Sequence, residues 1–314
     1  MKRFLAKHSP LVLLAVLCIV LGFVSENFRT PHNLQLVSLR TCVVAIIAAG
    51  QLLVILTAGI DLSVGSVAAL ANVVAALSMK EAGVPVEIAV ILGSAVGMIC
   101  GTVNGVLITL GRIPPFIVTL GMMMVARGLA MLITDATPIY TLPDRFDYLG
   151  GTRGWWIPVI IACAIIAIIT VMLSLTRFGR SLYAIGGNLS AARLSGISVD
   201  ALRVAAYALC GLSAGFAGVM LSSQVGMGDP NAGQGYELDS IAACVIGGTS
   251  LMGGEGTAVG ALAGALIMNV LVNFCNLNNI NVYWQQVLVG SLIVALVFYD
   301  NYRKHKAGLV QGGK

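Results

Sequence analysis

Uninterrupted apolar stretches, each about as long as a membrane span, run through nearly the whole sequence. A spanning helix needs about 20 mostly apolar residues. Only 10% of the residues are charged and 58% are hydrophobic, whereas soluble globular proteins carry about 25% charged residues. A soluble enzyme, a disordered chain and a nucleic-acid binder are poor fits, and we expect an all-α integral membrane protein.

We predict about ten transmembrane helices in a single domain over residues 1–314. The expected ranges are 9–24, 33–58, 62–79, 86–110, 114–133, 156–175, 202–222, 238–249, 257–274 and 282–299. Range 238–249 is too short to cross alone, so we expect a broken or re-entrant helix, buried in protein or lining a wet cavity. Residues 25–28 offer no signal-peptide cleavage site, so we expect the first range to be a retained span.

Positively charged residues set the expected orientation, since they gather on the cytoplasmic side of membrane proteins. With ten spans and a cytoplasmic N-terminus, twelve of the 18 Lys and Arg residues lie on the cytoplasmic side and five on the outer side. The twelve include Lys2, Arg3, Lys7 and Lys314. We therefore expect both termini in the cytoplasm, an outer loop near 135–155 and a cytoplasmic loop near 177–203.

Regularly spaced glycines predict close helix packing, because lipid provides no hydrophobic force between helices and small residues let backbones approach. Every fourth residue is glycine from Gly93 to Gly105. Shorter glycine series begin at Gly211 and Gly256. These faces indicate a tight multi-helix bundle and carry no information about cargo.

Two segments look irregular, since each is a glycine-interrupted turn that leads through an acidic residue into a small-residue helix. They are residues 57–66 and 226–240. They lie five spans apart, which suggests inverted halves with the transport pathway near their interface. Asp61 could face that pathway or cap the following helix, and we favour the cap. Arg127, within a span, is expected to pair structurally rather than to gate.

No energy source or catalytic centre is visible in the chain. The only Gly-Lys pair, Gly313-Lys314, ends the sequence, so there is no phosphate-binding loop. We predict no catalytic residue and no metal site, which makes an intramembrane enzyme a poor fit. Transport must be passive, ion-coupled or driven by another chain. Uncharged polar groups and one acid within the spans are the predicted pathway residues: Gln51, Asp61, Asn72, Asn104, Asn269 and Asn273.

The inner loop contains a short predicted helix of about two turns. Asn188 is a good helix start, and Gly196 is a natural stop. Small side chains would let this helix seat in a groove, and Arg193 could pair with an acidic partner. The candidate contact residues are Gly187, Asn188, Ala191, Ala192, Arg193, Leu194, Ser195 and Gly196.

Several segments together resemble the membrane subunits of ABC sugar importers, the ribose/xylose/arabinose/galactoside permease family. They are residues 53–66, 116–121, 127–128, 179–197, 236–243, 245–254 and 283–286. The resemblance implies a second permease copy, a separate ATPase subunit that hydrolyses ATP with Mg²⁺, and a periplasmic or lipid-anchored sugar-binding protein. It also implies that residues 187–196 form the helix that couples to the ATPase. This chain would itself bind no cofactor and no nucleic acid.

The resemblance further implies a multi-pass protein of the bacterial inner membrane, surrounded by lipid, that carries a monosaccharide or related polyol. Two alternatives remain. One is a stand-alone channel or ion-coupled carrier for a small polar solute. The other is an ABC permease for a nucleoside or a branched-chain amino acid, since such relatives keep part of this architecture.

Overall fold

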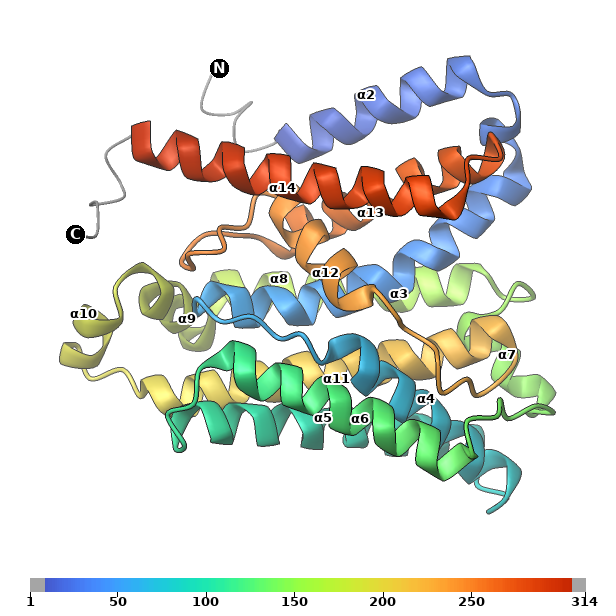
Figure 1. The fold of residues 1–314 in the computed structure, drawn as a ribbon, viewed down its shortest axis with the longest axis horizontal. Helices are drawn as coiled ribbons and strands as arrows, with labels where there is room; N and C mark the ends of the chain where they lie inside the picture. The colour runs from blue at the N-terminus through green and yellow to red at the C-terminus, as the bar shows by residue number, and fades with distance from the viewer. Residues whose placement is uncertain (1–8, 307–314) are drawn as a thin grey trace.

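The computed structural model describes residues 9–306, and in this part of the chain the regular structure is helical. Figure 1 shows long helices that cross the molecule in roughly the same direction or its reverse. The longer elements are α2 (Ser9–Val24), α3 (Pro31–Leu56), α4 (Val64–Lys80), α5 (Val86–Thr109), α6 (Pro115–Thr134), α8 (Trp156–Leu175), α11 (Val199–Val225), α13 (Ala258–Leu277) and α14 (Val282–Lys306). The shorter helices are α7 (Asp147–Gly150), α9 (Arg177–Gly187), α10 (Leu189–Leu194) and α12 (Tyr236–Ile246).

Each predicted apolar range coincides with one of these helices, and the all-α prediction is confirmed. Six helices among the described residues are long and apolar enough to cross a membrane: α3, α5, α6, α8, α11 and α13. Helices α2 and α4 are apolar but shorter, and α12 has 11 residues, as expected for a partial helix. The number of crossings stays a prediction. Lys2, Arg3, Lys7 and Lys314, which support the predicted orientation, lie outside the described residues.

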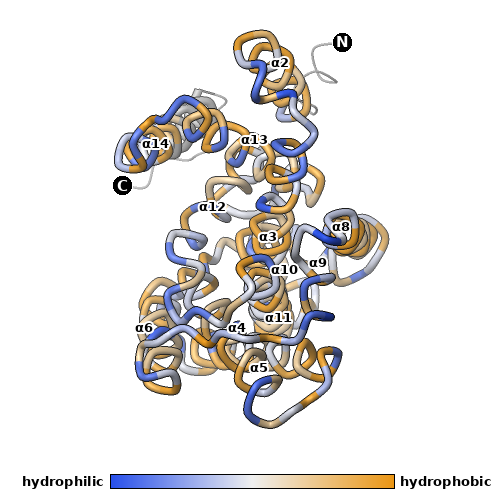
Figure 2. Tube along the Cα trace, turned by 90° about the vertical axis from the view of Figure 1, so that its right-hand side faces the viewer, coloured by the Kyte–Doolittle hydropathy of each residue, from blue (hydrophilic) through white to orange (hydrophobic). Residues whose placement is uncertain are grey.

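Helix α3 forms the centre of the bundle. In the most apolar 18-residue stretch of α3, 94% of the residues are buried, whereas in that of α6 only 22% are buried. Viewed along the helices, α3 is surrounded by α8, α11, α12 and α13 (Figure 2). The side chains of α3 that fill this core are almost all aliphatic, and they hold the helices together through van der Waals contact.

Glycines bring α5 and α11 into direct backbone contact. A Cβ atom added to Gly101 would lie 3.0 Å from the Gly211 Cα atom, and one added to Gly97 would lie 2.7 Å from the Gly215 Cα atom. In the same way, Gly264 of α13 faces the Ala243 carbonyl group of α12. The predicted role of the glycine series in helix packing is confirmed, because no side chain larger than hydrogen fits at these contacts.

Two long helices are each followed by an extended segment and a helix that begins inside the bundle. In Figure 1, α3 and α11 run in opposite directions. Residues 57–63 lead back from the left end of α3 toward the middle, where α4 begins, and residues 226–235 lead back from the right end of α11 to the start of α12. We call residues 57–63 the first break and residues 226–235 the second break.

The start of α4, directly after the first break, contacts the second break. A Cβ atom added to Gly65, at the start of α4, would meet the Gly233 carbonyl oxygen and the Glu237 carboxylate. Helix α6 holds the second break from its other side, since Arg127 Nη1 donates to the carbonyl oxygens of Pro230 at 2.6 Å and Ala232 at 2.8 Å. Arg127 therefore makes the kind of structural contact that was predicted, since free carbonyl groups at membrane depth need such donors; that it does not gate stays a prediction.

Candidate functional site

A pair of short helices projects from one end of the molecule, and Figure 1 places them on the left, at the end where α14 also ends. Asn188 lies between α9 and α10, and its side-chain oxygen accepts a hydrogen bond from the Ala191 N–H at 2.9 Å. Gly196 follows α10 with a left-handed φ of 78°. The predicted start and stop of the short helix are therefore confirmed.

The outer surface of α10 is open. Leu194 is 90% exposed, and Gly187, Asn188, Ala191 and Ser195 are also exposed. This large apolar side chain at a protruding tip is available for contact with a partner protein.

Two predicted contact residues behave differently from expectation. Ala192 is buried and packs in a small cluster with Ile185 and Val199, so it seats α10 on its own chain. Arg193 forms an ion pair with Asp200 of the same chain at 3.5 Å, and both side chains are exposed. Such an exposed pair contributes about 0–1 kcal/mol, so Arg193 stays available for another acidic group.

Helix α9 was not predicted, and it connects the projecting pair to the membrane bundle. Tyr183 donates a hydrogen bond from its hydroxyl to the Gly256 carbonyl oxygen at 2.8 Å, and burial raises the pKa of Tyr183. Gly186 lies directly against the Leu56 carbonyl group and Gly254. Apolar side chains that recur along α9 are the sequence signal that could have revealed it: Phe178, Leu182 and Ile185.

The same region contacts the first break. Arg203, near the start of α11, donates from Nη2 to the Thr57 carbonyl oxygen at 3.2 Å. The Gly254 N–H donates to the Leu56 carbonyl oxygen at 3.0 Å. The end of α3, the loop before α13 and the projecting helices are therefore joined by hydrogen bonds and close backbone contact.

Three of the predicted pathway residues come together at the first break. The Ser63 hydroxyl donates to Asp61 Oδ1 at 2.6 Å, and the Ser63 N–H donates to the same oxygen at 2.8 Å. Asn104 Nδ2 donates to the Ser63 hydroxyl at 3.0 Å. The Gln51 amide group lies 3.1 and 3.2 Å from the two backbone polar groups of Asp61, and it pairs with both when its nitrogen is assigned to the position facing the Asp61 carbonyl oxygen.

Asp61 thus differs in detail from the predicted cap. It accepts from Ser63, the residue that precedes α4, rather than from an amide of the first turn. The reason is that α4 begins at Val64, two residues later than expected, so Asp61 orders the turn that enters the helix. Asp61 Oδ2 and Asn104 Oδ1 are buried without a hydrogen-bond partner among the described residues.

The other three predicted pathway residues lie elsewhere. Asn72 accepts a hydrogen bond from the Asp229 N–H at 3.2 Å and so holds the second break. Asn273 exchanges two hydrogen bonds with Asn33, at 2.7 and 3.0 Å, which bridge α13 and α3. Asn269 donates to the Ala265 carbonyl oxygen of its own helix. The six residues therefore belong to several separate hydrogen-bonded groups, and their place on a transport path stays a prediction.

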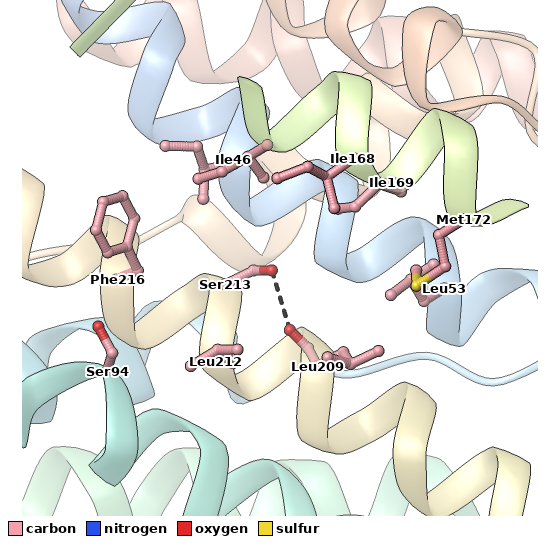
Figure 3. Close-up of a pocket in the computed structure, with 11 residues that line it drawn as sticks. Ile46, Leu53, Ser94, Ile168, Ile169, Met172, Leu209, Leu212, Ser213 and Phe216 are labelled. Carbon is pink, nitrogen blue, oxygen red and sulfur yellow. Dashed lines mark hydrogen bonds between the residues drawn. The ribbon is translucent and has the colours of Figure 1, made fainter. Parts of the chain in front are cut away.

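An apolar cavity of about 310 Å³ lies between α3, α8 and α11. Figure 3 shows its wall of Ile, Leu, Met and Phe side chains, with Ser94 and Ser213 as the polar groups in view. Ser213 donates its hydroxyl hydrogen to the Leu209 carbonyl oxygen at 3.0 Å. This cavity therefore offers few hydrogen-bonding groups to a polar solute.

Long apolar helices, two helices that begin inside the bundle and a polar cluster at one of the breaks define a multi-pass membrane transport protein. Comparisons with known proteins narrow this class. A family described as "Branched-chain amino acid transport system / permease component" matches residues 33–297. No solved structure matches the chain.

Several relatives are similar over almost their entire length. The ribose import permease protein RbsC of Escherichia coli (strain K12) is 42% identical over 309 residues, which is 96% of each chain. RbsC of Bacillus subtilis (strain 168) is 41% identical over 94% of this chain and 92% of its own. The D-allose transport system permease protein AlsC of E. coli (strain K12) is 35% identical over 95% of this chain and 92% of its own. The chain therefore belongs to the branched-chain amino acid transport system / permease component family.

Proposed function

We propose that the chain is the permease subunit of an ATP-binding-cassette importer that moves a monosaccharide into the cytoplasm. The relatives named for ribose and allose transport support the cargo, since they match this chain from end to end. A separate ATPase subunit would hydrolyse ATP with Mg²⁺, and an external sugar-binding protein, periplasmic or lipid-anchored, would deliver the solute.

The observation that carries the proposal is the projecting pair α9–α10. It presents an exposed Leu194 to a partner, and its other side contacts the end of α3 and the loop before α13. A partner that moves this pair would therefore act on helices that reach deep into the bundle.

The arrangement of the helices supports the proposed orientation in the bacterial inner membrane. The end of α14 and the projecting pair lie at one end (Figure 1), which agrees with a cytoplasmic C-terminus. The two breaks, which follow helices of opposite direction, agree with an inverted repeat. Helices α6 and α14 lie on one side of the bundle (Figure 2) and expose large apolar residues such as Met124 and Trp284, which suits a second permease copy.

The proposal is tested by Leu194→Glu in the assembled importer. Burial of one leucine at an interface is worth roughly 1.5–3 kcal/mol, so affinity for the ATPase subunit should fall about ten- to one-hundred-fold. Leu110→Glu is the matched control, since Leu110 is also exposed, at the end of α5. Unchanged affinity and sugar uptake in Leu194→Glu would contradict the proposal.

The same reconstituted system distinguishes the proposed function from two alternatives. Saturable sugar flux through this chain alone in liposomes, without ATPase and binding protein, would indicate a stand-alone channel or carrier. The description of the matched family favours an amino acid as second candidate cargo. Uptake of labelled leucine instead of labelled ribose, with the cognate binding protein present, would support that alternative.

A further inference from the structure

A second cavity, of about 500 Å³, lies among α3, α11, α12 and α13. Residues 150–152, which belong to the predicted outer loop, border it. Its walls are mainly apolar, with Leu36, Val44 and Val272 among them, and a few polar side chains face it. Sites for small molecules have volumes of about 300–1,000 Å³ and this same mixture of apolar walls and few polar groups.

Two of the polar groups are oppositely charged and unpaired. Arg40 of α3 and Asp239 of the first turn of α12 both line the cavity. Neither side chain makes a hydrogen bond or an ion pair with any residue of the described range 9–306. Arg40 is exposed, whereas Asp239 is half-buried. A charged group that is partly withdrawn from water is costly unless a partner satisfies it, so a bound molecule that pairs with Asp239 would be stabilised, and Arg40 lies where it can contact the same molecule.

The remaining polar groups add further hydrogen-bonding capacity. Tyr236 presents a phenol at the start of α12, and Asn269 of α13 has a side-chain oxygen that its own hydrogen bond to Ala265 leaves available. Gln224 of α11 also lines the cavity, and its amide donates to the Leu39 carbonyl oxygen of α3 at 2.8 Å. Donors and acceptors therefore converge from three helices on one space.

The chemistry of these groups selects a class of ligand. A guanidinium only donates and a carboxylate only accepts, whereas each sugar hydroxyl can do both. We propose that this cavity is a binding site for a neutral, polyhydroxylated sugar within the single permease chain, between the outer loop and the start of α12. This inference rests on the proposed function and extends it to named residues. A zwitterionic amino acid could meet the same two charges, and the experiment below separates it.

The position of the cavity agrees with this role. It reaches from the outer segment to the start of α12, which begins inside the bundle after the second break. Transporters commonly bind solutes where a helix is interrupted near the middle of the membrane. By contrast, the apolar cavity of Figure 3 has two serines as its only polar side chains among the residues that line it.

The test uses the complete importer, with its ATPase subunit and binding protein, reconstituted in liposomes. Labelled ribose uptake per ATP hydrolysed is compared for wild type, Asp239→Asn and Asn269→Ala. Glu81→Gln is the matched control, since Glu81 is an exposed acid just after α4 and does not line the cavity. Co-purification of the subunits checks that each variant assembles.

We expect the ratio of ribose to ATP to fall at least ten-fold in Asp239→Asn and at least three-fold in Asn269→Ala, with Glu81→Gln equal to wild type. Assembled variants that both transport ribose within two-fold of wild type would overturn the site while leaving the proposed function intact. A wild-type complex that transports leucine and not ribose would overturn the proposed function and this sugar site together.

Discussion

Arg127 is the side chain on which the second break most depends, and its removal gives a quantitative prediction. One nitrogen, Nη1, donates to the carbonyl oxygens of Pro230 and Ala232. A hydrogen bond to a charged group contributes about 1.5–3 kcal/mol to stability. Hydrogen bonds between the helices of a membrane protein contribute less on average, about 0.6 kcal/mol. For two bonds, one of them at 2.6 Å, we expect Arg127→Met to lower the free energy of unfolding by about 3 kcal/mol.

The measurement is denaturant-induced unfolding of the purified protein in detergent. Arg127→Lys should lower the free energy of unfolding by about half as much, because an ammonium group keeps the charge but lacks the planar set of N–H donors of a guanidinium group. Arg112→Met is the control, since Arg112 is exposed and makes no hydrogen bond or ion pair with the described residues. Backbone amides of residues 226–235 should also exchange faster with solvent in Arg127→Met. A loss below about 0.5 kcal/mol, with unchanged exchange, would refute the reasoning.

Further predictions concern the glycine contacts and the first break. Gly101→Val should destabilise the protein by about 1–3 kcal/mol in thermal unfolding, because the larger side chain does not fit the α5–α11 contact. Gly121→Val should not, since a Cβ at this position of α6 would have no neighbour within 4 Å among the described residues outside that helix. Equal melting temperatures for the two variants would contradict this packing. Gly186→Ala should reduce sugar uptake at least five-fold, because its Cβ would meet backbone atoms. Gly22→Ala on α2, where a Cβ would make only ordinary contacts, should leave uptake unchanged in the same assay; equal uptake by the two variants would exclude a role for the Gly186 contact. Asp61→Ala should lower the free energy of unfolding by about 2–3 kcal/mol, because the N–H and hydroxyl of buried Ser63 both lose their acceptor. An unfolding curve equal to that of wild type would contradict this account.

Most of the fold could be predicted from the sequence because the relevant signals are local. Apolar runs locate the helices, and a run that is too short identifies α12 as a partial helix. Asn188 and Gly196 bound α10 through their own side-chain and backbone preferences. Gly97 and Gly101 predict a close contact, although the spacing alone does not say that α11 is the partner.

The site was predicted less completely, since its contacts join residues that are distant in the chain. Asn33 and Asn273 are 240 positions apart, so the sequence could not reveal that they bridge two helices. Asp239 belongs to the irregular segment 226–240, which the sequence makes recognisable. The cavity that Asp239 lines is also lined by Arg40 of α3, and the sequence does not reveal that these two residues share it. A polar residue within an apolar span is expected to have a hydrogen-bonding partner, but only the three-dimensional fold shows which residue that partner is.

The contacts around the end of α3 show how a displacement of the projecting pair must spread. Gly186 of α9 lies against the Leu56 carbonyl group, and Gly254 donates to that same group. Arg203 holds the next carbonyl, that of Thr57, from α11. Packed backbones without intervening side chains cannot absorb a shift by changing rotamers. A movement of α9 therefore has to move the first break, the loop before α13, or both.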